Sequence, residues 1–379
     1  MYTNDFVRRM QSPGGDRRRG RSMHIDIPLL LTLIALCLGG LIVLYSASGQ
    51  SAFYVKRQGL FMLTGFVAMF FVAQLPVRFW ERYAVLFYAV GLLSLIMVLF
   101  FGVGAKGAQR WLDLGFTRLQ PSELMKVAVP LMISAYLGKR PIPPSFSHII
   151  VTLLLISLPV LLIVEQPDLG TSILIFAAGF FVLFLAGLRK RYLLGAFLLA
   201  LAAIPSLWFF VMRDYQKQRV LTLLSPEDDK LGAGWNIIQS TTAIGSGGLN
   251  GKGWTMGTQS QLNFLPESHT DFIIAVLAEE FGLIGVLTLC IAYLLLIGRC
   301  MVIALNSQSQ FGRLIAGSLS LTFFIYVFVN MSMVSGILPV VGVPLPLISY
   351  GGTAIVTLFL GFGILMAIST EPKRIRIDL

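Results

Sequence analysis

Residues 26–48 read DIPLLLTLIALCLGGLIVLYSAS, and this apolar run decides the kind of fold to expect. A helix rises about 1.5 Å per residue, so about 20 apolar residues cross the roughly 30 Å hydrocarbon core of a bilayer. The apolar core of a signal peptide has only about 7–15 residues. We therefore predict that residues 26–48 form a retained transmembrane helix.

Nine further apolar runs follow, and together they give ten predicted spans. Of the 379 residues, 56% are hydrophobic and 12% are charged, whereas soluble domains average about 25% charged residues. This composition excludes a soluble protein and predicts an all-α integral membrane protein, since helices satisfy their own backbone hydrogen bonds in lipid. The predicted spans are 26–48, 58–75, 82–101, 123–138, 148–164, 171–187, 192–212, 271–298, 311–338 and 346–369.

The basic residues orient this bundle. Cytoplasmic loops carry an excess of Lys and Arg, and a cytoplasmic N-terminus places most of the 29 basic residues in such loops. Both termini are then cytoplasmic, and the large loop at about 213–270, between spans seven and eight, faces outward. We assign residues 1–22 to a basic cytoplasmic tail and residues 23–379 to a single polytopic domain. Topology thus explains the net charge of +11 without nucleic acid.

Common ligand motifs do not occur in this sequence. It contains no zinc spacing, P-loop, dinucleotide fingerprint or G-x-S-x-G elbow. The glycine-rich stretch GSGGLNGKGWTMG at 245–257 follows no predicted strand, so it is a weak nucleotide signal, and we assign it to the outer loop. We predict no dedicated metal site. A divalent cation (Mg or Mn) bound together with a substrate stays open.

Charged residues gather at the predicted outer mouth of the bundle. Arg57 lies at the mouth of the second span and Arg110 in the loop before the fourth. Glu123 and Lys126 are three residues apart, so they share a helical face within that span. Charges inside a span are costly and usually face a cavity or a partner. The cations predict an anionic ligand, and the alternative for them is ordinary loop charge and contact with lipid headgroups. For Glu123 and Lys126 the alternative is a pair that only holds the bundle together.

Two acids stand where predicted helices begin. Asp168, in VEQPDLGTS at 164–172, can cap the next helix. Asp271 lies in LNFLPESHTDFIIAVLAEE at 262–280, where Ser268 and Asp271 have the spacing of a capping box. The other interpretation of Asp271 is a reactive acid at the outer mouth.

Two deeper acids follow Asp271. Glu279 and Glu280 lie about 12 Å further along the helix and point away from the Asp271 face. We expect them to hold the bundle together, with Arg299 and Arg313 as candidate partners.

Residues 335–354, SGILPVVGVPLPLISYGGTA, contain four glycines and three prolines. Such a composition disfavours a helix. Irregular backbone at membrane depth is tolerated where it is buried in protein or lines a wet cavity. We predict a rigid, non-helical segment that shapes a cavity wall.

Taken in order along the chain, these motifs resemble the SEDS family of cell-wall glycosyltransferases. The resemblance covers nearly all of the chain after the basic tail. The form GVPLP at 342–346 is similar to the elongation branch of the family rather than to its division branch. Departures are small, such as Thr353 where Ser is usual and Ser332 where Gly is common. The matching motifs are YSASG, QRWLDLG, QPSELMK, EQPDLGTS, IGSGGLNGKGW, NFLPESHTDFI, VLAEEFG and GVPLPLISYGG.

The resemblance implies a substrate and a reaction. The substrate is lipid II, a disaccharide-pentapeptide on undecaprenyl pyrophosphate, and its disaccharides are joined β-1,4 into glycan strands at the outer face of the cytoplasmic membrane during elongation. Asp271 matches the family's essential acid and is expected to act as general base in an inverting attack, while basic residues stabilise the leaving pyrophosphate. The residues expected to bind substrate are Arg57, Arg110, Glu123, Lys126, Asp168, His269 and Thr270.

The resemblance also implies a partner and a location. We expect a class B penicillin-binding protein, penicillin-binding protein 2 of the elongation complex, to contact spans eight and nine and the outer loop. The location is the bacterial cytoplasmic (inner) membrane, with the lipid bilayer around the spans. Two other functions compete with the polymerase: a transporter that flips lipid II, and a scaffold that docks a cell-wall synthase.

Overall fold

The computed structural model describes most of the chain. The predicted basic tail at 1–22 lies outside the described residues. The described residues are 24–105, 108–113, 115, 118–229, 232–261, 265 and 267–372.

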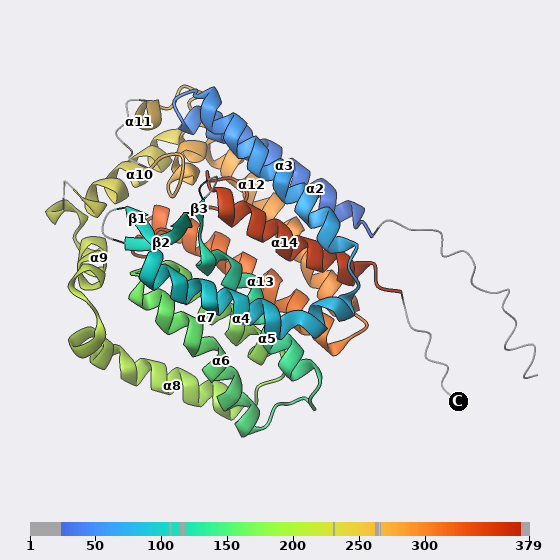
Figure 1. Ribbon diagram of the computed structural model, residues 1–379. Helices are drawn as coiled ribbons and strands as arrows, with labels where there is room; N and C mark the ends of the chain where they lie inside the picture. The colour runs from blue at the N-terminus through green and yellow to red at the C-terminus, as the bar shows by residue number, and fades with distance from the viewer. Residues whose placement is uncertain are drawn as a thin grey trace, which may run out of the picture.

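Ten long helices carry the fold within these residues, one for each predicted span (Figure 1). Several helices extend beyond the predicted apolar run, because a helix can continue past the hydrocarbon with polar residues, as Lys56 and Arg57 do. The helices are α2 (Ile27–Ala47), α3 (Ala52–Ala73), α4 (Val77–Phe101), α5 (Pro121–Gly138), α6 (Phe146–Glu165), α7 (Leu169–Leu185), α8 (Lys190–Ser206), α12 (Ile273–Asn306), α13 (Gln310–Val334) and α14 (Gly352–Ser369).

Eight of the helices are long and apolar enough to cross a membrane, namely all except α5 and α7, where α8 is counted with the helical turn that follows it, as Lys190–Phe210. Helix α7 is apolar but has 17 residues, and α5 contains Glu123 and Lys126. Large apolar side chains such as Leu31, Leu154 and Leu295 are exposed on the outside of the bundle. That pattern suits a protein whose surroundings are lipid. The prediction of an all-α membrane protein is confirmed.

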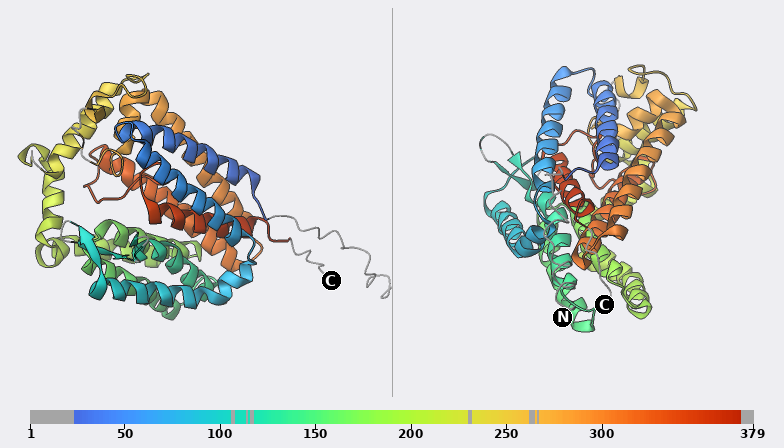
Figure 2. Two further views of the ribbon diagram at one scale, coloured as in Figure 1. Left: turned by 45° about the horizontal axis from the view of Figure 1, so that its top comes forward. Right: turned by 90° about the vertical axis from the view of Figure 1, so that its right-hand side faces the viewer.

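The helices pack as two groups around separate apolar cores. The larger core joins α2, α3, α12, α13 and α14 with part of α4 and α5, and the other joins α4, α5, α6 and α7 with Leu314 of α13. Helix α8 lies at the edge of the molecule (Figure 2), and none of its described side chains is buried. The first group therefore brings together helices from the two ends of the sequence.

The segments at one end of the bundle are more ordered than expected. Three short antiparallel strands, β1 (Val103–Ala105), β2 (Ala108–Asp113) and β3 (Arg118–Leu119), lie between α4 and α5, in the order β1-β2-β3. The sequence analysis did not predict this sheet. The predicted outer loop is largely helical, with α9 (Asp214–Leu224), η2 (Pro226–Asp228), α10 (Ala233–Gly247) and α11 (Thr258–Gln261), while η1 (Leu207–Val211) lies in the predicted seventh span, after α8.

A polar cluster joins the start of α2 to the end of α14 at the opposite end of the bundle. Arg299 donates to both carboxylate oxygens of Asp26, over 3.0 Å from Nε and 2.6 Å from Nη2. His24 contacts Thr370 over 2.8 Å. Burial opposes ionisation of Asp26, but the hydrogen bonds from Arg299 and Ser369 outweigh it and leave its pKa below the ordinary value. The suggested pairing of Arg299 with Glu279 or Glu280 is therefore wrong.

Helix α12 is kinked at Gly282, where φ is 64°. The glycine-rich segment 248–253 crosses the kink and exchanges backbone hydrogen bonds with it: Lys252 N–H donates to Glu279 O over 3.0 Å, and Leu283 N–H to Gly248 O over 2.9 Å. A Cβ at Gly251 would lie 2.1 Å from the carbonyl oxygen of Glu280. The glycines thus permit a close approach of two backbones, which explains this stretch without a nucleotide.

The segment between α13 and α14 is non-helical, as predicted. Leu345, Leu347 and Ile348 are buried. The buried side chain of Gln58, on α3, donates to the carbonyl of Ser349 over 2.9 Å and accepts from the amide of Gly351 over 3.3 Å. The irregular backbone is thus satisfied inside the protein, as membrane depth requires.

The kink leads to a prediction about Gly282. In Gly282→Ala the new Cβ would lie 2.4 Å from the Gly251 amide nitrogen, and a positive φ is unfavourable for alanine by about 1–2 kcal/mol. We expect a lower thermal unfolding temperature in detergent. The matched control is Gly298→Ala on the same helix, where a Cβ meets nothing within 4 Å. Equal unfolding temperatures for the two variants would contradict the role of the kink.

Candidate active site

Asp271 lies just before α12, on the turn formed by residues 267–272. The helix begins at Ile273 with Phe272 as N-cap, so the predicted capping box of Ser268 and Asp271 does not form. The Ser268 hydroxyl instead donates to the carbonyl of Ala47 on α2 over 2.9 Å. Asp271 is therefore not explained as a member of a capping box.

Three consecutive carbonyls of this turn accept hydrogen bonds from other segments. The His269 carbonyl accepts from the Tyr350 amide over 2.9 Å, and the Thr270 carbonyl from the Ser349 hydroxyl over 2.5 Å. The Asp271 carbonyl accepts from the side-chain amide of Asn330, on α13, over 2.9 Å. The backbone that carries the Asp271 carboxylate is therefore held from two sides.

Several charged side chains act electrostatically on Arg219, on α9. Burial lowers the pKa of Arg219; Arg110 acts in the same direction, whereas Tyr215, Asp168 and Asp271 oppose it. An arginine stays charged at neutral pH despite this shift, because its ordinary pKa lies far above neutrality. Arg219 thus gathers Arg110, Asp168 and Asp271 into one electrostatic group.

Asp168 performs its predicted capping role and more. It is 4% exposed, and its carboxylate accepts from the Thr171 amide over 3.3 Å at the start of α7. Gln120 donates to its other oxygen over 3.2 Å. Arg110, on β2, lies 4.0 Å from the carboxylate and donates to the carbonyls of Gln166 and Pro167. Asp168, which caps α7, and the cation Arg110 therefore belong to the same site.

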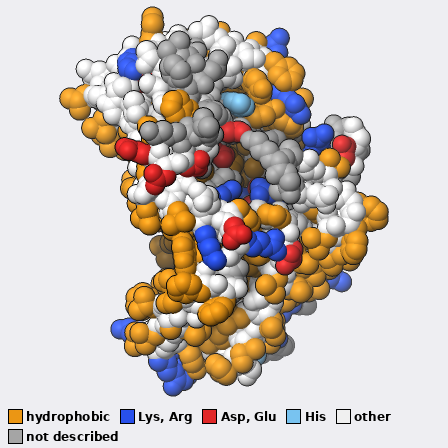
Figure 3. Space-filling view, turned by 90° about the vertical axis from the view of Figure 1, so that its left-hand side faces the viewer, with side chains coloured by type: hydrophobic (Ala, Val, Ile, Leu, Met, Phe, Trp, Pro, Cys, Tyr) orange, Lys and Arg blue, Asp and Glu red, His pale blue; other side chains and the backbone are white. Residues whose placement is uncertain are grey.

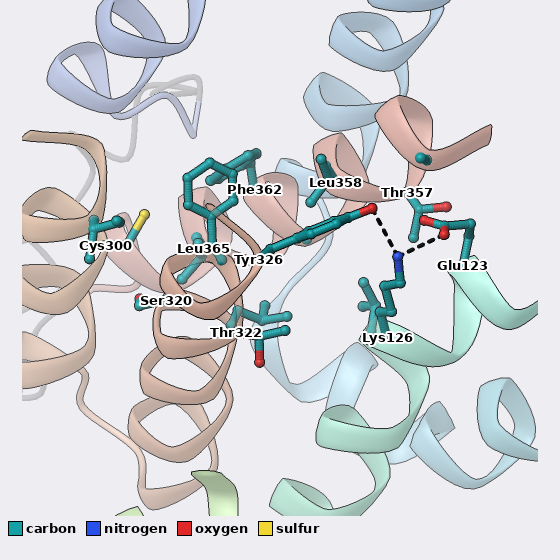
Figure 4. A pocket seen from close by; sticks show the side chains of 16 residues that line it. Glu123, Lys126, Cys300, Ser320, Thr322, Tyr326, Thr357, Leu358, Phe362 and Leu365 are labelled. Atoms are coloured by element: carbon teal, nitrogen blue, oxygen red, sulfur yellow. Dashed lines mark hydrogen bonds and ion pairs between the residues drawn. The ribbon is translucent and has the colours of Figure 1, made fainter. Parts of the chain in front are cut away.

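Glu123 and Lys126 pair within α5, as their spacing predicts. The Lys126 ammonium lies 2.7 Å from the Glu123 carboxylate and donates to the Tyr326 hydroxyl over 3.1 Å (Figure 4). Both charged residues are about nine-tenths buried or more, at 5% and 6% exposure. The adjoining cavity is lined by this pair and Tyr326 together with mostly apolar side chains. In this arrangement the pair forms part of the wall of that cavity.

Arg57, His269 and Thr270 lie around a second group of side chains. The His269 ring is 4.9 Å from the ring of Tyr54, which meets the Tyr350 ring edge-on at 5.2 Å. Arg57 is exposed and acts electrostatically on Tyr350. The Thr270 hydroxyl donates to Glu267 over 2.9 Å. His269 and Thr270 belong to the turn that carries Asp271. Arg57 is linked to this turn through Tyr350, whose amide donates to the His269 carbonyl.

Figure 3 shows the end of the bundle that bears these groups. Acidic and basic side chains gather around a hollow in the middle of this face, while hydrophobic side chains cover much of the surface around them. A charged hollow bordered by apolar surface suits a ligand with a polar head and an apolar tail.

Glu279 and Glu280 have structural partners in the outer segments. The Glu279 side chain is fully buried and lies 2.7 Å from the Lys252 ammonium, and it accepts from the Thr258 and Gln259 amides over 2.8 and 3.0 Å. The Ser46 hydroxyl donates to Glu280. Their predicted holding role fits these contacts, but Arg299 and Arg313 are not the partners.

The described residues contain no group of three or more His, Cys, Asp or Glu side chains arranged to hold a metal ion. The donor set of this site therefore does not fit a cation cage made by the protein alone.

Sequence reasoning missed three residues of the site. Arg219 lies in the predicted outer loop, and nothing in its sequence neighbourhood marks it as a site residue. Asn330 and Tyr326 are polar residues inside a span, which is a usable signal because polar groups at membrane depth are costly.

Known proteins resemble this chain over most of its length. The FtsW/RodA/SpoVE family model, described as cell cycle protein, matches residues 27–374. Peptidoglycan glycosyltransferase MrdB of Escherichia coli K12 is 55% identical over 351 residues, which cover 93% of this chain and 95% of the relative. The probable peptidoglycan glycosyltransferase FtsW of Geobacter metallireducens is 38% identical over 361 residues, with 92% and 95% covered.

Solved structures share the fold as well. A chain from a structure of a peptidoglycan synthase complex that coordinates polymerization and crosslinking superimposes with a TM-score of 0.81 at 31% identity, covering 91% of this chain and 97% of that one. The crystal structure of the rod shape determining protein RodA of Thermus thermophilus gives a TM-score of 0.69 at 29% identity, with 91% and 96% covered.

The double role of Asp168 can be separated by substitution. Asp168→Ala removes the helix cap, which is typically worth about 1 kcal/mol, whereas Asp168→Asn keeps a good capping side chain. We expect the alanine variant to unfold at a clearly lower temperature in detergent and the asparagine variant to stay near the wild type. The same large loss in both variants would show that the charge beside Arg110, rather than the cap, carries the stability.

Proposed function

Since this chain belongs to the FtsW/RodA/SpoVE family and is a peptidoglycan glycosyltransferase of the bacterial inner membrane, we propose that it polymerises lipid II during cell elongation. It joins the disaccharides β-1,4 into glycan strands at the outer face of the membrane. The observation that carries this proposal is the Asp271 carboxylate on a turn whose backbone is bonded to two other segments, within electrostatic reach of Arg219, on which Arg110 also acts.

In the proposed reaction Asp271 acts as general base. It takes the proton of the acceptor sugar's 4-hydroxyl as that oxygen attacks the anomeric carbon of the donor. The new glycosidic bond forms while the bond from the anomeric carbon to the pyrophosphate breaks, and the pyrophosphate leaves with the electron pair. Attack opposite the leaving group inverts the α-linked donor to a β-linkage. A positioned base of this kind typically contributes about 10²–10⁴-fold.

The arginines stabilise the negative charge of the leaving pyrophosphate. Guanidinium groups can contact phosphate oxygens through two parallel hydrogen bonds. Arg110 and Arg219 are the cations that share the electrostatic group of Asp271, and the exposed Arg57 is available on the side of Tyr350. Lys126 and Glu123, which pair with each other, support the wall of the site. No step of this proposal runs through a metal ion.

We propose a class B penicillin-binding protein as the partner that crosslinks the product. Support comes from the similarity to a chain of a peptidoglycan synthase complex. Large apolar side chains of α12, such as Leu287 and Leu294, are exposed at the predicted contact spans.

The first test is Asp271→Asn in a reconstituted assay with purified lipid II and the penicillin-binding protein. Loss of the base predicts a fall in the polymerisation rate of about 10²–10⁴-fold. The product is measured as the length and amount of glycan strands. The variant must elute as a folded, partner-bound complex for the result to count.

The same assay separates the competing functions. Long glycan strands made by Asp271→Asn would sink the catalytic assignment. Movement of lipid II across vesicles by a wild type that makes no strands would favour the transporter. Full function from every folded variant that binds its partner would favour the scaffold.

A second test concerns Arg219. Arg219→Gln removes a cation from the group around Asp271, and loss of one such donor typically costs about 10²-fold in turnover. The matched control is Lys217→Gln on the same helix, since two residues along a helix face nearly opposite directions. We expect the control to retain wild-type polymerisation. Equal losses in both variants would show a general effect of loop charge instead.

A further inference from the structure

Asn330, on α13, is buried with 0% exposure and is not explained by the packing of apolar spans. A polar side chain at membrane depth is costly unless its hydrogen-bonding groups find partners. Its amide nitrogen donates to the carbonyl of Asp271 over 2.9 Å and to the carbonyl of Val343 over 2.7 Å. Both hydrogens of one NH₂ group are thus used.

The two acceptors belong to the two backbones that meet at the Asp271 carboxylate. One is the turn that carries Asp271, and the other is the non-helical segment that contains Gly342 and Val343. A Cβ placed on Gly342 would lie 3.7 Å from the Asp271 Oδ2 atom. Because an NH₂ group has a fixed planar geometry, its two hydrogen bonds set the separation of these backbones.

The orientation of the Asn330 amide follows from the same contacts. A reversed amide would direct its oxygen at two carbonyl oxygens, which cannot donate. In the observed orientation Oδ1 is buried and has no hydrogen-bond partner. An unpaired buried oxygen is unfavourable. The side chain therefore keeps its two donated hydrogen bonds although its own oxygen has no partner.

We propose that Asn330 is a positioning residue for catalysis: it holds the Asp271 turn at a fixed distance from the Gly342 segment. The proposal rests on the proposed role of Asp271 as base. Hydrogen bonds from Ser349 and Tyr350 fix the preceding carbonyls of the turn, and Asn330 fixes the residue whose side chain reacts. A displacement of a reacting group by about 1 Å can cost roughly 10²-fold in rate.

The test compares two variants on the same helix. Asn330→Leu keeps a similar shape and removes both donors. Ser318→Ala is the matched control, because Ser318 is also fully buried on α13 and donates 2.7 Å to the carbonyl of Ala178 on a neighbouring helix, away from the Asp271 turn. Polymerisation kinetics with lipid II are measured for both, together with amide hydrogen exchange over residues 267–275.

For Asn330→Leu we expect kcat to fall about 10–100-fold while KM changes less than about 3-fold, since the base is misplaced and the binding surfaces persist. Amide exchange should become faster in the 267–272 turn. Ser318→Ala should show neither effect, even where its unfolding temperature drops.

Two outcomes would overturn the inference. The first is a kcat loss in Asn330→Leu no greater than in Ser318→Ala while Asp271→Asn is inactive. The second is unchanged exchange of the 267–272 turn in Asn330→Leu. If Asp271→Asn stayed active, the proposed function itself would be wrong. An unchanged kcat of Asn330→Leu would contradict only the positioning role of Asn330.

Discussion

Every backbone group at membrane depth must find its hydrogen bond within the protein, and this constraint organises the whole structure. Helices meet it by themselves, but the reactive turn and the segment after α13 do not. Gln58, Ser349 and Asn330 supply the missing partners by bonding to the backbone of these irregular stretches. These three polar side chains thus bond where the chain departs from a helix, which is also where Asp271 lies.

The site combines contributions from segments that are far apart in the sequence. Strand β2 carries Arg110, the start of α7 carries Asp168, and α9 carries Arg219. The rigid bundle fixes the positions of the first two, while the outer helices bring in the third. Apolar helix faces beside this charged hollow (Figure 3) allow a lipid chain to stay in the membrane while its polar head reacts.

The sequence was sufficient for the spans, the Asp168 cap and the Glu123–Lys126 pair, because each depends on length or on spacing within one helix. The predictions that were wrong all concern contacts between distant segments of the chain. The capping box was wrong since Ser268 found a tertiary partner at Ala47. The partners of Glu279 were wrong because the prediction assumed a straight helix, whereas the kink at Gly282 and the crossing segment bring Lys252 to this acid. Arg219 and Asn330 act across long separations that no local pattern reveals.

The crossing of the kink by residues 248–253 has a consequence for sequence drift. The contact is made by backbone atoms, so it imposes little on the side chains of Leu249 and Asn250. It strongly restricts Gly247, Gly251 and Gly282, because a Cβ at any of them would lie within about 2.5 Å of the opposing segment. Amino-acid replacements should accumulate freely at Leu249 and Asn250 during evolution and hardly at all at these three glycines. Insertions or deletions within the segment would shift the register of the contact and disturb the helix that begins beside Asp271.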